Sequence, residues 1–249
     1  MTIWAIADLH LSLGVSNKEM TVFGPQWEGY LQKIEKNWHE LVDPSDLVLI
    51  PGDISWAMNV AEARPDLAWI GELPGTKLLL RGNHDYWWGS LAKIKPILPP
   101  SCHLIQNNSF SWHGVSIAGT RLWDIPGISF QGVVDFKESK TVKKLTADSD
   151  PTEMEKIYER ELGRLEASLK TIPAQNKTRI VMTHYPPLGP AMQPTATTQL
   201  LEKYGVQICV FGHMHNVKKD IPLFGSLNGI EYVLTACDYQ GRFCPIKVL

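Results

Sequence analysis

The sequence KLLLRGNHDYWW, residues 77–88, places three leucines directly before a run of polar and ionisable side chains. The leucines predict a short buried strand, because a brief apolar run without alternation is typical of a strand covered on both faces. The residues after them, Arg81 to Asp85, include an amide, an imidazole and a carboxylate. The end of this strand is therefore expected to lie at a chemical site.

The same pattern, an apolar run followed by side chains that bind metals, occurs at four other places. The predicted strands and the polar residues after them are Ile3–Ala7 before Asp8 and His10, Leu47–Ile50 before Asp53, Ile180–Met182 before His184, and Ile208–Phe211 before His213 and His215. In α/β proteins, ligands gather at the carboxyl ends of strands. We therefore expect all five strand ends, including the one before Asn83, to meet in one pocket.

Helical patterns alternate with these strands, which predicts an α/β fold (α+β in some schemes). Apolar residues at three- and four-residue steps predict helices over residues 27–42 and 151–169, and Pro65 is expected to open a short helix. Weaker strands at His103–Gln106 and Val115–Gly119 are expected to pair with each other.

The chain, residues 1–249, is expected to form a single domain, since no repeat or linker divides it. One segment, residues 127–149, is polar and lacks clear periodicity. This segment is expected to be an excursion over the core, either a cap or an ordinary surface loop.

The composition limits the class of partner. Lys plus Arg is 24 and Asp plus Glu is 26, for a net charge of −2, which gives no general attraction to nucleic acid or anionic membranes. The first residues lack a basic leader, no run approaches a membrane span, and the four cysteines form no CxxC pair. A cytoplasmic protein that acts on a small molecule is the expectation.

The residues at the strand ends predict metal chemistry. Carboxylate, imidazole and amide oxygen together suit manganese, iron or zinc, and the absence of cysteine from these clusters argues against a thiolate zinc site. A single tetrahedral metal uses at most four ligands, whereas more candidates suit two divalent metal ions that share a carboxylate. The seven candidate ligands are Asp8, His10, Asp53, Asn83, His184, His213 and His215.

Five motifs in order, DLH, GD, GNHD, THYPP and GHMH, resemble those of the calcineurin-like metallophosphoesterases, in particular the bacterial-type phosphohydrolases. The resemblance implies a four-layer α-β-β-α sandwich with two mixed sheets. It also implies hydrolysis of a phosphomonoester or phosphodiester by a hydroxide that bridges two metals. By the resemblance, one metal would be held by Asp8, His10 and His215, the other by Asn83, His184 and His213, with Asp53 between them.

The resemblance gives the catalytic role to His84, which would protonate the leaving group, while Asp85 would bind the other imidazole nitrogen. The protein phosphatase branch continues its second motif as G-D-x-x-D-R-G, whereas residues 52–58 here read GDISWAM. Protein phosphatase activity is therefore not expected. The roles of Arg81, Trp56 and the pair Trp87–Trp88 stay open.

Two other functions remain as alternatives. An inactive member of the family would use the fold as a scaffold that binds a protein partner. A nuclease would need a basic groove, for which the chain offers Lys137, Lys140, Lys143 and Lys144.

Overall fold

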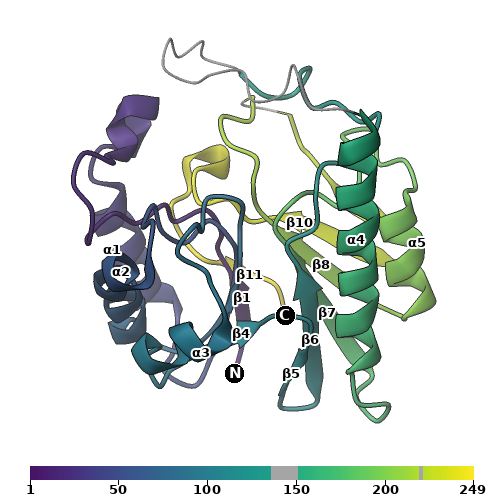
Figure 1. The fold of residues 1–249 in the computed structure, drawn as a ribbon, viewed down its shortest axis with the longest axis horizontal. Helices are drawn as coiled ribbons and strands as arrows, with labels where there is room; N and C mark the ends of the chain where they lie inside the picture. The colour runs from purple at the N-terminus through teal and green to yellow at the C-terminus, as the bar shows by residue number, and fades with distance from the viewer. Residues whose placement is uncertain (136–150, 219–220) are drawn as a thin grey trace.

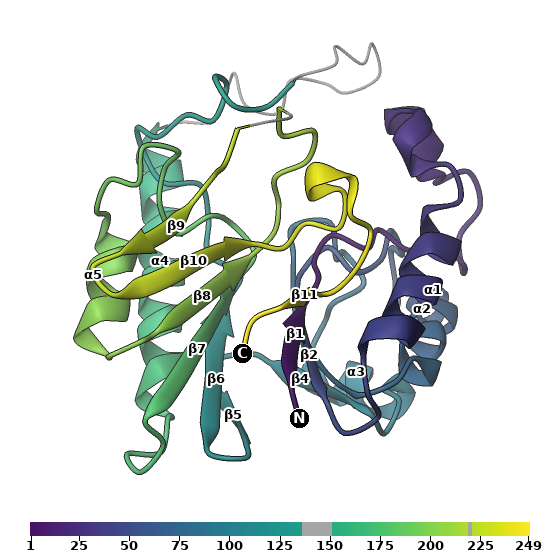
Figure 2. The same ribbon diagram turned by 180° about the vertical axis from the view of Figure 1, so that it is seen from behind.

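A computed structural model describes residues 1–135, 151–218 and 221–249. Within them, the strands form two sheets (Figures 1 and 2). The first sheet has the order β11-β1-β2-β3-β4 and contains β1 (Ile3–Ala5), β2 (Leu47–Pro51), β3 (Thr76–Leu80), β4 (Cys102–Ile105) and β11 (Ile246–Lys247). The second has the order β5-β6-β7-β8-β10-β9 and contains β5 (Ser109–Trp112), β6 (Val115–Thr120), β7 (Thr178–Thr183), β8 (Ile208–Phe211), β9 (Gly225–Leu227) and β10 (Ile230–Leu234).

Both sheets are mixed. Strands β1 to β4 run parallel, as do β6, β7, β8 and β10, while β11, β5 and β9 are antiparallel to their neighbours. Parallel neighbours need crossover connections, which place helices on the outer faces. Because the central strands of each sheet point the same way, their carboxyl ends lie along one edge.

Helices cover the outer face of each sheet (Figures 1 and 2). The first sheet is covered by α1 (Tyr30–Leu41), α2 (Val60–Glu72) and α3 (Leu91–Ile94), and the second by α4 (Pro151–Lys170) and α5 (Ala196–Lys203). Short 3-10 turns occur at η1 (Met20–Phe23), η2 (Pro25–Trp27), η3 (Lys95–Ile97) and η4 (Tyr239–Gly241). This arrangement confirms the expected α-β-β-α sandwich.

The residues of β2 show why the sandwich has three apolar layers. Leu49 packs between the sheets in the same cluster as Ile117 of β6, whereas Val48 packs with Trp38 of α1. Alternate side chains of a strand point to opposite faces, so an all-apolar strand serves two cores at once.

One expected strand pairing was wrong, and one strand was missed. The strand β4 pairs with β3 in the first sheet, and β6 pairs with β5 in the second, so the predicted pairing of β4 with β6 does not occur. The missed strand is β5, an edge strand whose sequence, SFSW, carries no apolar run. The chain therefore passes from one sheet to the other where a hairpin was expected.

The expected helices also need correction. Pro65 lies inside α2, which instead begins after Asn59, where the side chain accepts hydrogen bonds from the backbone N–H groups of Ala61 and Glu62. A side-chain cap of this kind decides where a helix begins. The first expected helix begins at Tyr30, because Gly29 adopts a left-handed conformation (φ 59°). The sequence interpretation missed α5.

Part of the expected excursion at 127–149 is described. Residues up to 135 form turns, and Val134 makes an isolated antiparallel bridge to Val217. Residues 136–149, with the four lysines that would serve a nuclease, lie outside the described residues, so the cap stays a prediction. In the part of the chain that the structure describes, no helix is sufficiently long and apolar to span a bilayer.

Candidate metal centre

The loops that come after β1, β2, β7 and β8 meet where the two sheets face each other. The backbone N–H of Asp8 donates to Gly52 O (3.0 Å), and that of Gly212 donates to His184 O (3.1 Å). Across the sheets, His184 Nδ1 lies 3.0 Å from Pro51 O. The strand ends therefore converge as the sequence pattern predicted, because parallel strands share one carboxyl edge.

One group of donor atoms surrounds Asp8. His10 Nε2 lies 3.0 Å from His215 Nε2, and His215 Nε2 lies 3.8 Å from Asp8 Oδ1. One atom from each of these residues lies within 4.8 Å of the other two, a spacing that a single metal ion can bridge. Asp8 and His10 are buried, and His215 is partly exposed.

A second group surrounds Asn83. Its Oδ1 lies 2.7 Å from His184 Nε2 and 3.0 Å from His213 Nδ1. The amide oxygen and two imidazole nitrogens thus point at one another from three different loops. The structure therefore brings together the residues that the sequence interpretation assigned to a second metal.

Asp53 lies between the two groups. Its Oδ2 is 3.7 Å from His10 Nε2, and its Oδ1 is 3.4 Å from His184 Nε2. Each carboxylate oxygen thus faces a different group, which is the placement expected of a shared ligand. Asp8 also lies near both groups, since it forms a second cluster of possible ligands with Asp53 and His184.

The backbone at four of the candidate ligands is strained. The φ angles are 60° at Asp8, 45° at His10, 50° at Asp53 and 72° at His213. Positive φ is uncommon outside glycine, and such strain clusters at functional sites, where the surrounding structure holds it. All four of these residues contribute donor atoms to the centre.

Two glycines leave room for the carboxylates. A Cβ at Gly82 would lie 2.1 Å from Asp53 Oδ1, and one at Gly212 would lie 2.3 Å from Asp8 Oδ2. The glycines of the GNHD and GHMH motifs therefore allow backbone and ligand to approach closely.

The ionisable groups shift one another's pKa values. Burial raises the pKa of Asp8 to about 7, against the opposing effect of the His215 imidazole. Burial would also raise the pKa of Asp53, but the imidazoles of His184 and His10 outweigh it and hold that pKa well below its usual range. Burial acts to lower the pKa of His184 and of His215, but neighbouring carboxylates raise each to about 9.

His84 stands apart from the donor groups. Its backbone N–H donates to Asp53 Oδ1 (2.8 Å), while its ring lies 4.6 Å from the Trp56 ring and 5.6 Å from the His10 ring, between centroids. Its Nδ1 is buried and has no hydrogen-bond partner among residues 1–135, 151–218 and 221–249. The imidazole therefore borders the centre, and within the described part of the chain its Nδ1 is unpaired.

The expected bond between Asp85 and His84 is absent. Asp85 Oδ1 accepts the backbone N–H groups of Ile54 (2.9 Å) and Ser55 (3.1 Å) and the indole N–H of Trp87 (3.0 Å), and Oδ2 accepts the N–H of Gly82 (2.7 Å). The Asp85 carboxylate is fully buried and points at these donors, not at the His84 ring. Through these hydrogen bonds the carboxylate links the loop after β2 to the loop after β3.

The sequence interpretation missed Asp238, whose Oδ1 lies 2.9 Å from His215 Nδ1. A signal was present, since the segment Tyr232–Ala236, which also reads as a short strand, ends two residues before Asp238. This strand, β10, runs parallel to β8, so its end meets the loop that carries His215. Trp87 and Trp88 are both buried in the core of the first sheet.

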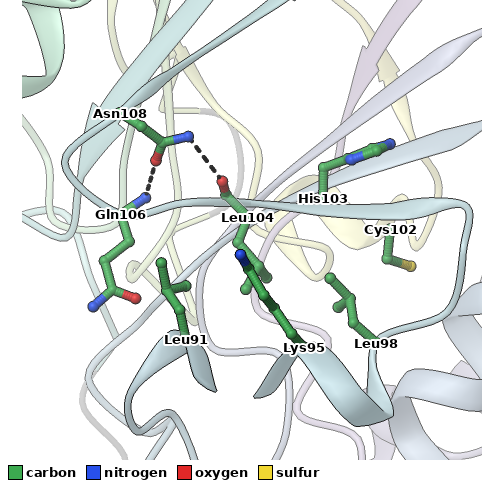
Figure 3. Close-up of a pocket in the computed structure, with 8 residues that line it drawn as sticks. All are labelled: Leu91, Lys95, Leu98, Cys102, His103, Leu104, Gln106 and Asn108. Carbon is green, nitrogen blue, oxygen red and sulfur yellow. Dashed lines mark hydrogen bonds between the residues drawn. The ribbon is translucent and has the colours of Figure 1, made fainter. Parts of the chain in front are cut away.

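A separate cavity of about 350 Å³ lies beside β4 (Figure 3). Leu91 and Lys95 line one side and His103 and Leu104 the other, and Asn108 Nδ2 donates to Leu104 O (3.3 Å). None of the candidate ligands lines this cavity, so it is not part of the centre.

A family model described as calcineurin-like phosphoesterase matches residues 1–217, which include all the candidate ligands. Two curated relatives are the Gene 66 proteins of the Mycobacterium phages D29 and L5. They are 34% and 33% identical to the chain over 83 and 82 residues, which is 33% of the chain in each case. The matched stretch spans 40% and 39% of the phage proteins' length.

Solved structures share the fold. A phosphopantetheinyl hydrolase from Mycobacterium tuberculosis has a TM-score of 0.55 at 17% identity, covering 100% of this chain and 95% of the hydrolase. A protein of unknown function from Aquifex aeolicus has a TM-score of 0.51 at 15% identity, covering 99% and 95%. At these identities the likeness concerns the fold alone.

Proposed function

Because the chain belongs to the calcineurin-like phosphoesterase family, we propose that it hydrolyses a phosphomonoester or phosphodiester with two divalent metal ions held between its sheets. Family membership and the clustered donors support a metal-dependent phosphoesterase in general terms. The number of metals, the ester and the assignment of each residue are our proposal. The observation that carries it is Asp53, whose two oxygens face separate groups of donors.

The chemistry of the donors fits divalent cations. Buried carboxylates are normally paired or bound to metals, and here they lie among imidazole nitrogens and one amide oxygen. We assign Asp53 to both metals, and the remaining ligands in two sets, Asp8, His10 and His215 for one metal and Asn83, His184 and His213 for the other. Manganese, iron and zinc all accept these ligands.

The metals, when bound, supply positive charge beside the phosphoryl oxygens and the Lewis acidity that activates water. The chain's own contribution to the reaction is His84, which borders His10 and Asp53 and belongs to neither donor group. Burial lowers the pKa of His84, so its imidazolium is a stronger acid but a smaller fraction of the ring is protonated at neutral pH. We assign to His84 the proton that the leaving oxygen needs.

The test compares a nitrophenyl phosphomonoester with a bis-nitrophenyl phosphodiester, on protein stripped of metal and reloaded with manganese, iron or zinc. We expect two metals per chain and metal-dependent hydrolysis of at least one ester. Asp53→Asn should lose most of the bound metal and most of the hydrolysis. The control Asp43→Asn, at an exposed carboxylate, should keep both the metal and the hydrolysis. Two bound metals with no hydrolysis of either ester would favour the inactive scaffold.

A further inference from the structure

Trp56 forms a wall of the centre on the side of His84. Its ring stacks on the His10 ring, with centroids 4.8 Å apart and planes at 26°, and lies 4.6 Å from the His84 ring. Its indole N–H points to Met20 Sδ (3.3 Å), which is buried in η1. The Trp56 ring is thus held by the proposed metal ligand His10 on one side and by the turn η1 on the other.

The aromatic surface continues outward from Trp56 to Phe23. The two rings are nearly parallel, with planes at 7° and centroids 6.5 Å apart. Phe23 is 37% exposed, and Tyr86, whose ring lies 6.2 Å from the His84 ring, is 53% exposed. Large aromatic side chains are normally covered, so this exposure beside the centre needs a reason.

A flexible, exposed side chain lies over the Trp56 ring. The ammonium of Lys18 lies 5.5 Å from the centroid of the Trp56 ring, and Lys18 itself is exposed. Electron-rich ring faces attract cations, and an exposed lysine moves aside at little cost. Displacement of Lys18 would therefore give a planar group access to the Trp56 ring.

We propose that Trp56, Phe23 and Tyr86 bind the leaving group of the substrate, and that the preferred esters carry a planar aromatic ring on that group. The inference rests on the proposed function, because the side of the centre that holds the proton donor is the side where the leaving oxygen departs. A flat ring gains face contacts from parallel aromatic side chains that a flexible alkyl chain does not gain. The ring is joined to the ester oxygen directly or through a short linker.

Non-hydrolysable ligands test this preference in binding. Phenylphosphonate and butylphosphonate share the phosphoryl group and differ in the group that occupies the leaving-group side. We would measure both dissociation constants by titration calorimetry on metal-loaded protein. We expect phenylphosphonate to bind more tightly, and Phe23→Ala to reduce its advantage by about two- to tenfold while butylphosphonate binding stays unchanged.

Val22→Ala is the matched control, because Val22 lies on the same turn and is 78% exposed. It should change neither dissociation constant. Equal binding of the two phosphonates, or equal losses for both in Phe23→Ala, in a protein that still hydrolyses esters would overturn this inference and leave the proposed function intact. Absence of all ester hydrolysis in the metal-loaded protein would overturn both.

Discussion

Asp238 Oδ1 lies 2.9 Å from Nδ1 of His215, and Asp238 Oδ2 accepts the backbone N–H of Asn216 (3.2 Å). The carboxylate therefore fixes the ring so that Nε2 faces Asp8 and His10. Carboxylates behind ligating imidazoles commonly set the ring orientation and increase its basicity. Asp238 is thus a positioning residue for the proposed first metal.

Asp238→Ala should weaken the metal bound by His215 by about 10- to 100-fold, because the ring loses its orientation and its carboxylate partner. Metal titration followed by elemental analysis measures this loss. Activity should recover at high metal concentration, since Asp238 itself does not touch substrate. The metal affinity of Asp238→Asn, which keeps an acceptor oxygen, should lie between those of the wild-type protein and Asp238→Ala. Unchanged metal affinity in Asp238→Ala would contradict this role.

The sequence predicted that the candidate ligands converge, because each comes after an apolar run, and the carboxyl ends of parallel strands bring such residues together at one edge of the sheet. It did not predict Asp238, because one carboxylate after a strand is a weak signal until the fold places β10 beside β8. Nor could it predict which way the Asp85 side chain points, because in a loop that direction depends on backbone angles, which the sequence pattern does not give. The strands after β3 were mispaired because β5 carries no apolar pattern.

His84→Ala should leave the metals bound and slow the esters of poor leaving groups most. A leaving oxygen with a high pKa needs a proton as its bond breaks, whereas nitrophenolate departs without one. We expect losses of about 10²- to 10⁴-fold for an alkyl ester and smaller losses for the nitrophenyl ester. The measurement is kcat for both esters at equal metal content. Equal losses for the two esters would remove His84 from the proton-donor role.

Asp85→Ala should reduce the free energy of unfolding by about 3–5 kcal/mol, because it leaves four buried N–H donors without an acceptor. These donors belong to the backbone of Ile54, Ser55 and Gly82 and to the indole of Trp87. Urea unfolding measures the change, and Asp85→Asn, which keeps one acceptor oxygen, should lose less. Full stability with lost activity would instead favour a direct catalytic role for Asp85.

Metal affinity should rise with pH up to about 9. In the metal-free protein, neighbouring carboxylates outweigh burial and raise the pKa of His184 and of His215 to about 9, so both rings carry an extra proton at neutral pH. A metal must displace that proton to reach the ring nitrogen. Below about pH 9, binding therefore releases protons and strengthens as pH rises; above it, this gain ends.

Calorimetry in two buffers of different protonation enthalpy counts the released protons. We expect a net release near neutral pH, to which the Asp8 carboxyl adds, since burial raises its pKa to about 7. In Asp238→Ala, the pKa of His215 should fall, and fewer protons should be released at the same pH. Affinity that does not change between about pH 7 and about pH 9 would contradict this coupling.

Gly212→Ala should disable the centre through Asp8. The added Cβ would lie 2.3 Å from Asp8 Oδ2 and 2.6 Å from Ala7 Cβ, so the carboxylate must move. A displacement of about 1 Å at a ligand can cost about a hundredfold in rate, and we expect a loss of that size together with weaker metal binding. The added methyl group should also cost about 1–3 kcal/mol of stability, because the site has no free volume.

Gly163→Ala is the control for the same substitution. Gly163 lies in α4, and apart from its chain neighbours and the adjacent helix backbone, no atom of the described residues lies within 4 Å of the added Cβ. Alanine favours the helix by up to about 1 kcal/mol over glycine, so this variant should be equally or more stable and fully active. Thermal unfolding and kcat at saturating metal distinguish the two variants. Wild-type activity in Gly212→Ala would show that the position of Asp8 tolerates displacement, and would argue against its direct contact with a metal.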